Sequence, residues 1–141
     1  MKIATSYFYQ IRNFKPWMIP VSTAMTDPFW YKPPQGKEWF IDRRGIVCGL
    51  RYEPLIIQSQ GTPEEYRKLL DTVDFDRLIK AFTFCSEKFK RPFGDPEPMI
   101  VLMVYEAPDN PFSERSALQD YFSCHNWSCE ELKYPIDYNY Y

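Results

Sequence analysis

Two carboxylates follow an unbroken apolar run near the middle of the chain. Glu106 comes directly after residues 99–105, and Asp109 lies in the turn that follows. Two carboxyl groups in unlike environments can divide the roles of general acid and general base. Burial beside an apolar strand would raise the pKa of Glu106. We therefore take Glu106 and Asp109 as the candidate catalytic residues.

The residues after this turn are of the types that bind anions at the start of a helix. Asn110 is a good helix cap, and Pro111 suits the first helical position. The free amide of Ser113 and the helix dipole would then attract an anion. Arg115 can add bidentate contacts to a phosphate or a carboxylate. We assign Asn110, Ser113 and Arg115 to the binding of a small anionic ligand.

The same residues also have a purely structural interpretation. Asp109 or Asn110 can serve only as a helix cap, and Arg115 can pair with Glu106 or Glu114. Both interpretations stay open at the level of sequence.

The apolar run predicts a buried strand that brings these residues to one edge of a sheet. Residues 99–105 are too short for a buried helix, because Glu106 to Pro108 stop the run. Strands also suit residues 2–8 and 19–23, and helices suit the stretches that begin at Pro63 and Asp74. We predict a single α/β domain over residues 1–141 with a mostly parallel central sheet and helices on both faces.

Two segments depart from this alternation of strands and helices. The turn at residues 42–45 contains Gly45 and lies between two extended runs, which predicts a β-hairpin insertion near residues 38–52. From about residue 133 the chain becomes a tyrosine-rich tail.

The start of the chain should contribute to the same site. Ligands of open parallel sheets bind beyond the carboxyl ends of the strands. Ser6 and Tyr7 end the first predicted strand, and Asp27 follows the second. We therefore add Ser6, Tyr7 and Asp27 to the candidate ligand-binding residues.

Composition limits the classes of partner. The net charge of -2 is spread along the chain, which excludes bulk duplex nucleic acid because that partner needs a clustered basic face. No apolar run approaches the length of about 20 residues that a membrane span needs. Aromatic residues make up 18% of the chain, which predicts that some rings lie at a surface, at an interface such as a homodimer contact, or at a ligand site. The alternative is a small core that is filled with large side chains.

The four cysteines do not form the pattern of a disulfide framework, and we expect a cytoplasmic protein with reduced thiols. Cys124, His125 and Cys129 invite a zinc or a Cys–His nucleophile interpretation. The spacing of the two cysteines is looser than in common zinc sites, and no second ligand pair follows. We predict no metal, and the chain contains no glycine-rich motif for a cofactor.

The strand and turn at residues 99–115 resemble the late motif of the Domain of Unknown Function 488 family. In that family an apolar strand ends in an acidic residue, and a Cys-His-Arg triplet opens the next helix. Glu106 and Arg115 match this pattern, whereas either residues 112–113 (Phe-Ser) or residues 113–114 (Ser-Glu) stand in the place of Cys-His. Residues 5–7 and the segment that leads to Asp27 resemble the early motif of the family, without its arginine. The resemblance implies the fold, and it implies that any Cys-His chemistry has been lost.

Three functions fit these patterns. The first is binding of a nucleotide or another small anion at the carboxyl ends of the strands, in a phage or mobile-element context. The second is a small hydrolase or glycosidase-like enzyme that acts on a nucleotide through Glu106 and Asp109. The third is a protein–protein interaction module.

Overall fold

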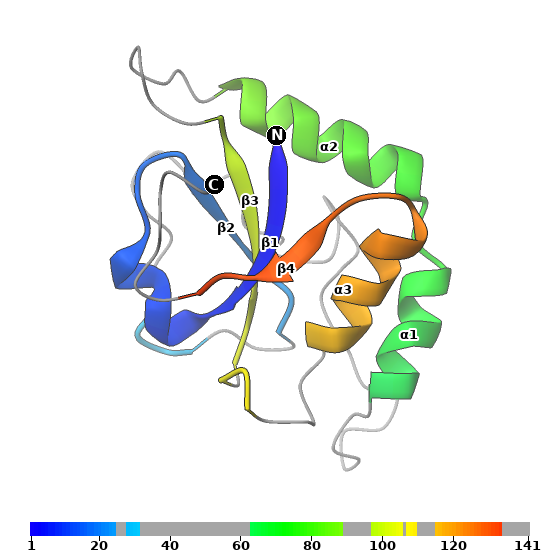
Figure 1. Cartoon of the computed structure of the whole chain (residues 1–141), viewed down its shortest axis with the longest axis horizontal. Helices are drawn as coiled ribbons and strands as arrows, with labels where there is room; N and C mark the ends of the chain where they lie inside the picture. Colours follow the sequence, from blue (N-terminus) through cyan, green and yellow to red (C-terminus); the bar gives the residue numbers. More distant parts are fainter. Residues whose placement is uncertain (25–27, 32–62, 89–96, 106, 110–114, 134–141) are drawn as a thin grey trace.

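The described residues form a four-stranded, all-parallel sheet with helices packed against it, which confirms the predicted α/β fold (Figure 1). The structure, a computed structural model, describes residues 1–24, 28–31, 63–88, 97–105, 107–109 and 115–133. The strands lie in the order β2-β3-β1-β4. Their bounds are Lys2–Tyr7 for β1, Met18–Ser22 for β2, Met99–Val104 for β3 and Cys129–Glu131 for β4.

The apolar run forms the strand β3, between β2 and β1. All of Met99–Val104 is buried, as expected for a strand that is covered on both faces. Its register places Ile100 beside Ile3 on one side and Ile19 on the other. Tyr105 lies past the end of the strand and is exposed. The prediction of a buried strand is therefore confirmed, and it ends one residue earlier than the apolar run.

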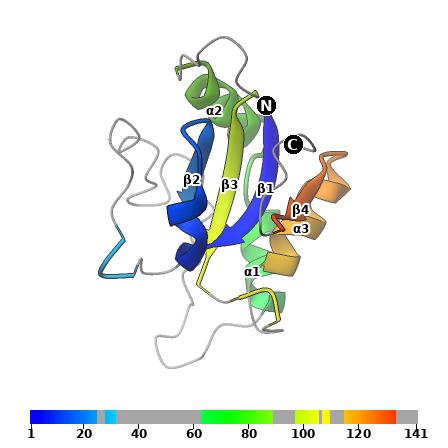
Figure 2. The ribbon, with the colours of Figure 1, turned by 60° about the vertical axis from the view of Figure 1, so that its left-hand side comes forward.

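The two faces of the sheet are covered by different kinds of helix (Figure 2). The helices α1 (Pro63–Asp71), α2 (Phe75–Lys88) and α3 (Arg115–Cys124) pack on the face that carries Ile3, Ile19 and Ile100. The 3-10 helix η1 (Phe8–Asn13) packs on the opposite face, with Phe8 buried against Ala4 and Met103. The α-helical face is the one that holds the site described below.

Local sequence signals explain where several elements begin. The carboxylate of Asp74 accepts a hydrogen bond of 3.2 Å from the amide of Arg77 and so caps α2, which confirms the helix that was predicted to begin at Asp74. Pro63 is the first residue of α1, where its missing amide hydrogen costs nothing. Pro20 lies in β2, an edge strand of the described sheet, where fewer ladder bonds are needed.

The C-terminus of α3 closes in a Schellman motif. The amide of Trp127 donates to the carbonyl of Phe122 at 2.9 Å, and the amide of Asn126 donates to Ser123 at 3.0 Å. Asn126 has a φ of 64°, a left-handed conformation that asparagine tolerates better than most residues. This turn directs the chain from α3 into β4, which carries a central residue of the site.

We expect the left-handed turn to depend on the residue type at position 126. Asn126→Val should lower the free energy of unfolding by about 1–2 kcal/mol, because a β-branched side chain clashes in this conformation. Asn126→Gly should stay close to the wild type. Chemical denaturation measures both variants, and equal stability of the valine and glycine variants would contradict this description of the turn.

Some predicted features lie outside the described residues, namely the hairpin near residues 38–52 and the tyrosine-rich tail. In the described part of the chain, no helix has the length and apolar character that crossing a membrane requires.

Candidate functional site

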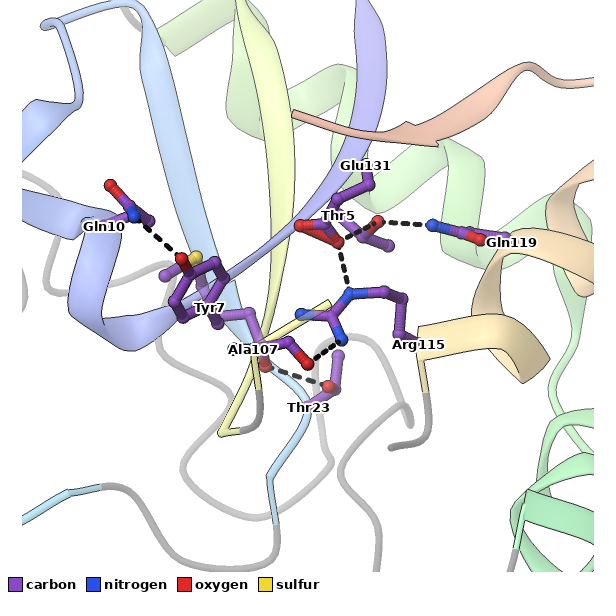
Figure 3. A network of polar contacts seen from close by, with 9 residues as sticks. Thr5, Tyr7, Gln10, Thr23, Ala107, Arg115, Gln119 and Glu131 are labelled. Carbon is purple, nitrogen blue, oxygen red and sulfur yellow. Dashed lines mark hydrogen bonds and ion pairs between the residues drawn. The ribbon is translucent and has the colours of Figure 1, made fainter. Parts of the chain in front are cut away.

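A cluster of polar side chains lies where β1 and β4 end and α3 begins (Figure 3). Thr5 comes from β1, Glu131 is the last residue of β4, and Arg115 is the first residue of α3. Thr5 and Glu131 are register partners in the sheet, so their side chains leave on the same face. Because the strands are parallel, this cluster lies at the edge where ligands of such sheets bind.

The cluster is connected by a chain of hydrogen bonds. Gln119 of α3 donates through Nε2 to Thr5 Oγ1 at 2.8 Å, and Thr5 Oγ1 donates to Glu131 Oε1 at 3.0 Å. Arg115 Nε donates to the same oxygen of Glu131 and forms an ion pair with it. Arg115 Nη1 donates to the carbonyl oxygen of Ala107 at 3.2 Å. One carboxylate oxygen therefore connects β1, β4 and α3.

The two oxygens of the Glu131 carboxyl group have different surroundings. Oε1 accepts hydrogen bonds from Thr5 and Arg115, whereas Oε2 is buried and has no hydrogen-bond partner in the described part of the chain. Burial raises the pKa of Glu131, and this effect outweighs the charge of Arg115 and the hydrogen bonds, which lower it. Glu131 thus holds a proton more readily than an exposed glutamate does.

Arg115 is enclosed by the elements around it. Its side chain is 8% exposed, and that of Glu131 is 19% exposed. The guanidinium carbon lies 5.9 Å from the centre of the Tyr7 ring, close enough for a cation–π contact. The Tyr7 hydroxyl accepts a hydrogen bond of 2.8 Å from Gln10 Nε2 in η1. The Tyr7 ring therefore lies beside the Arg115–Glu131 ion pair and forms one side of the site.

The raised pKa of Glu131 makes stability depend on pH in a definite direction. The folded state holds the Glu131 proton at pH values where the unfolded chain, with a pKa of about 4.3, has released it. This contribution is fully present below the unfolded pKa and is lost as the pH rises through the folded pKa. The melting temperature of the wild type minus that of Glu131→Gln should therefore fall as the pH rises from acid toward neutral. A constant or rising difference would contradict the pKa shift.

The structure brings only part of the predicted site together. Arg115 and Tyr7 lie in the cluster. Ser6 is buried, but strand alternation directs its side chain toward the other face of the sheet, where its neighbours Ala4 and Phe8 pack. Asp109 is exposed in the segment after β3. Ser6 therefore lies across the sheet from Arg115.

Four predicted site residues lie outside the described part of the chain. They are Glu106, Asp27, Asn110 and Ser113. Their assignment to catalysis or to ligand binding stays a prediction. The predicted helix with an amino end near Asn110 is described from Arg115 onward, as α3.

Sequence reasoning did not assign Gln119 and Glu131 to the site. Glu131 lies in a strand of only three residues, Cys129–Glu131, which is too short to show a periodic pattern. Its neighbours Glu130 and Lys133 are charged and exposed, so the segment resembles a surface loop. The only hint in the sequence is one apolar residue, Cys129, two positions before Glu131, which is the spacing of one strand face.

Cys124 and His125 lie at the opposite end of α3 from Arg115, whereas Cys129 lies in β4 beside the cluster. His125 is exposed and stacks on Phe75, with ring centres 3.8 Å apart. Cys129 is buried, and burial raises the pKa of its thiol to about 12, so the thiol stays protonated and unreactive. Among the described residues, no three histidine, cysteine or acidic side chains lie close enough together to hold a metal ion.

Several aromatic rings lie at the surface, as the composition predicted. Tyr9, Phe29, Trp30, Phe84 and Tyr105 are the large exposed side chains. Phe29 is 98% exposed, whereas Tyr105 has an edge-to-face contact with buried Phe8 at 5.5 Å between ring centres. The homodimer interface that these rings suggested stays a prediction.

Comparison of the chain with known protein families, characterised proteins and solved structures finds no match. The resemblance to the Domain of Unknown Function 488 family therefore stays a prediction.

Proposed function

We propose that the carboxyl edge of the sheet binds a small anionic ligand, with a nucleotide as the leading candidate, and that Arg115 is the cation that holds it. The observation that carries this proposal is an arginine that is 8% exposed at the edge where the strands end. Guanidinium groups bind phosphate and carboxylate through charge-assisted hydrogen bonds. A cation that is shielded from water also attracts an anion more strongly than one on an open surface.

The surroundings of Arg115 support a binding role. Glu131 and the Ala107 carbonyl fix the orientation of the guanidinium group, so little entropy is lost when a ligand binds. Tyr7 adds an aromatic surface 5.9 Å from the guanidinium carbon. A ligand with an anionic group and a flat ring, such as a nucleotide, matches this combination.

A matched pair of arginine variants tests the proposal. A thermal-shift screen with AMP, ATP, GMP, cyclic AMP and sulfate identifies ligands, because a bound ligand raises the melting temperature. Arg115→Lys should weaken binding by about 10- to 100-fold, since lysine lacks the planar fork of donors. Arg67→Lys is the control, because Arg67 pairs with Asp120 on the outer surface and should leave binding unchanged. Equal binding by the wild type and both variants would contradict the proposal, as would a screen without any shift.

A second candidate function is a small hydrolase that acts on a nucleotide. The observation in its favour is the raised pKa of Glu131, because general acids are often carboxyl groups whose pKa is raised by burial. In this function Glu131 takes the role of the acid that the sequence assigned to Glu106 or Asp109. Product formation by the wild type that is lost in Glu131→Gln, with binding retained, would favour the enzyme. Binding without any product would favour the first proposal.

A further inference from the structure

The ion pair at the site places a negative charge directly beside the cation that would hold the ligand. Glu131 Oε1 accepts the hydrogen bond from Arg115 Nε and the hydrogen bond from Thr5. An anion that binds to Arg115 therefore approaches an existing carboxylate in a region that is largely shielded from water. Like charges held close together at low dielectric cannot both stay ionised without a large penalty.

The geometry of Glu131 offers a way to remove that penalty. Its second oxygen, Oε2, is buried and has no hydrogen-bond partner in the part of the chain that the structure describes. A buried ionised carboxylate with one unsatisfied oxygen is costly, and a proton on that oxygen removes the charge. Burial already favours the neutral form, since it raises the pKa of this carboxyl group. The carboxyl group can therefore change its charge without moving away from Arg115.

Few other groups near Glu131 can take this role. On α3 the neighbouring charged group is Arg115, the ion-pair partner of Glu131. On β1 the titratable neighbour of the pair is the Tyr7 phenol, and on β4 it is Cys129, whose raised pKa keeps it neutral. Asp109 in the segment after β3 is exposed, and Glu130 is exposed and belongs to the opposite face of β4. Glu131 is thus the group, among the described residues, that combines burial with a charge that opposes the ligand.

We infer that Glu131 takes up a proton when an anion binds to Arg115, so that ligand binding at this edge of the sheet is coupled to pH. This inference rests on the proposed function. The proton comes from solvent and adds to the Glu131 carboxylate, and no covalent bond of the ligand changes. Affinity should then rise as the pH falls between the pKa of Glu131 in the bound state and its pKa in the free state. The rise is limited to tenfold for each pH unit, because one proton is involved.

Calorimetry with an anion that does not titrate itself tests this coupling. Cyclic AMP and sulfate keep a constant charge between about pH 5 and pH 8, where the side chain of a buried glutamate can titrate. Titration in two buffers with different ionisation enthalpies counts the protons taken up. The wild type should take up a measurable fraction of one proton, and its affinity should rise as the pH falls. Glu131→Gln should bind with no proton uptake, with an affinity independent of pH and at least equal to that of the wild type at neutral pH.

Glu130→Gln is the matched control, because it removes an exposed carboxylate from the neighbouring position of β4 and should keep the proton uptake. Binding of cyclic AMP or sulfate without proton uptake would overturn the coupling and leave the proposed function intact. Proton uptake that persists in Glu131→Gln would also overturn it, since another group would then be the acceptor. Failure of both anions, and of AMP, ATP and GMP, to bind at any pH would overturn the proposed function itself.

Discussion

Replacement of Arg115 with methionine should lower the free energy of unfolding by about 3–5 kcal/mol at neutral pH, because it leaves a buried carboxylate without its ion-pair partner. Methionine retains much of the apolar bulk of the arginine side chain, so the loss reflects mainly the charge. The loss should shrink at acid pH, where Glu131 becomes protonated and no longer needs a counter-ion. Urea denaturation at two pH values measures both effects.

The double variant Arg115→Met, Glu131→Met separates the ion pair from the packing around it. Replacing both partners of a buried pair with apolar residues is often close to neutral, so the double variant should recover most of the stability that the single variant loses. The double variant should nevertheless bind no anion. If the single and double variants are equally unstable, the buried charge is not the cause, and the role that we assign to the pair is wrong.

The second large effect concerns Phe122, a buried residue of α3 that packs against α2. Phe122 is fully buried and contacts Phe75 and Phe82, with ring centres 6.1 and 6.4 Å away. Phe122→Ala should lower the free energy of unfolding by about 3–5 kcal/mol, because it removes a large apolar side chain and leaves a cavity. The Phe122 carbonyl also closes the turn that leads into β4, the strand that carries Glu131.

Ser123→Ala is the control on the next residue of α3. Ser123 is exposed, and its carbonyl, which closes the turn, is kept in the variant, so its stability should stay within about 0.5 kcal/mol of the wild type. Thermal and chemical denaturation should agree on the order of the two variants. A small loss for Phe122→Ala would show that this residue does not hold α3 in the core.

The elements that strong periodic or apolar patterns predict are the ones that the structure confirms. The apolar run at residues 99–105 contains no proline, glycine or charged residue, and its length identifies the buried strand β3 from the sequence alone. The start of α1 at Pro63 and the cap of α2 at Asp74 follow from local chemistry, which needs no knowledge of the rest of the fold. These signals depend only on neighbouring residues, so they can be recognised in a single sequence.

The site was only partly predictable, because the ion-pair partner of Arg115 lies in a different element, β4. Arg115 was identified from its place after a strand and a turn, but its ion-pair partner is Glu131. The contact depends on the turn at Asn126, which returns the chain from α3 to the edge of β1. Nothing in a three-residue strand flanked by charged residues indicates that one of its carboxyl groups will be buried. Ser6 was placed at the correct end of the sheet but on the opposite face from Arg115, because a strand turns successive side chains to opposite faces.

The most direct test of a ligand site at Arg115 is the nuclear magnetic resonance signal of its side-chain Nε–H group during titration with cyclic AMP. The signal is identified by its absence in Arg115→Lys. Because Nε donates to Glu131 in the free protein, a bound anion and a protonated Glu131 should both change its surroundings. We predict a saturable shift of this signal that follows binding measured by calorimetry. Saturable binding that leaves the Arg115 signal unmoved would place the ligand elsewhere and contradict the account.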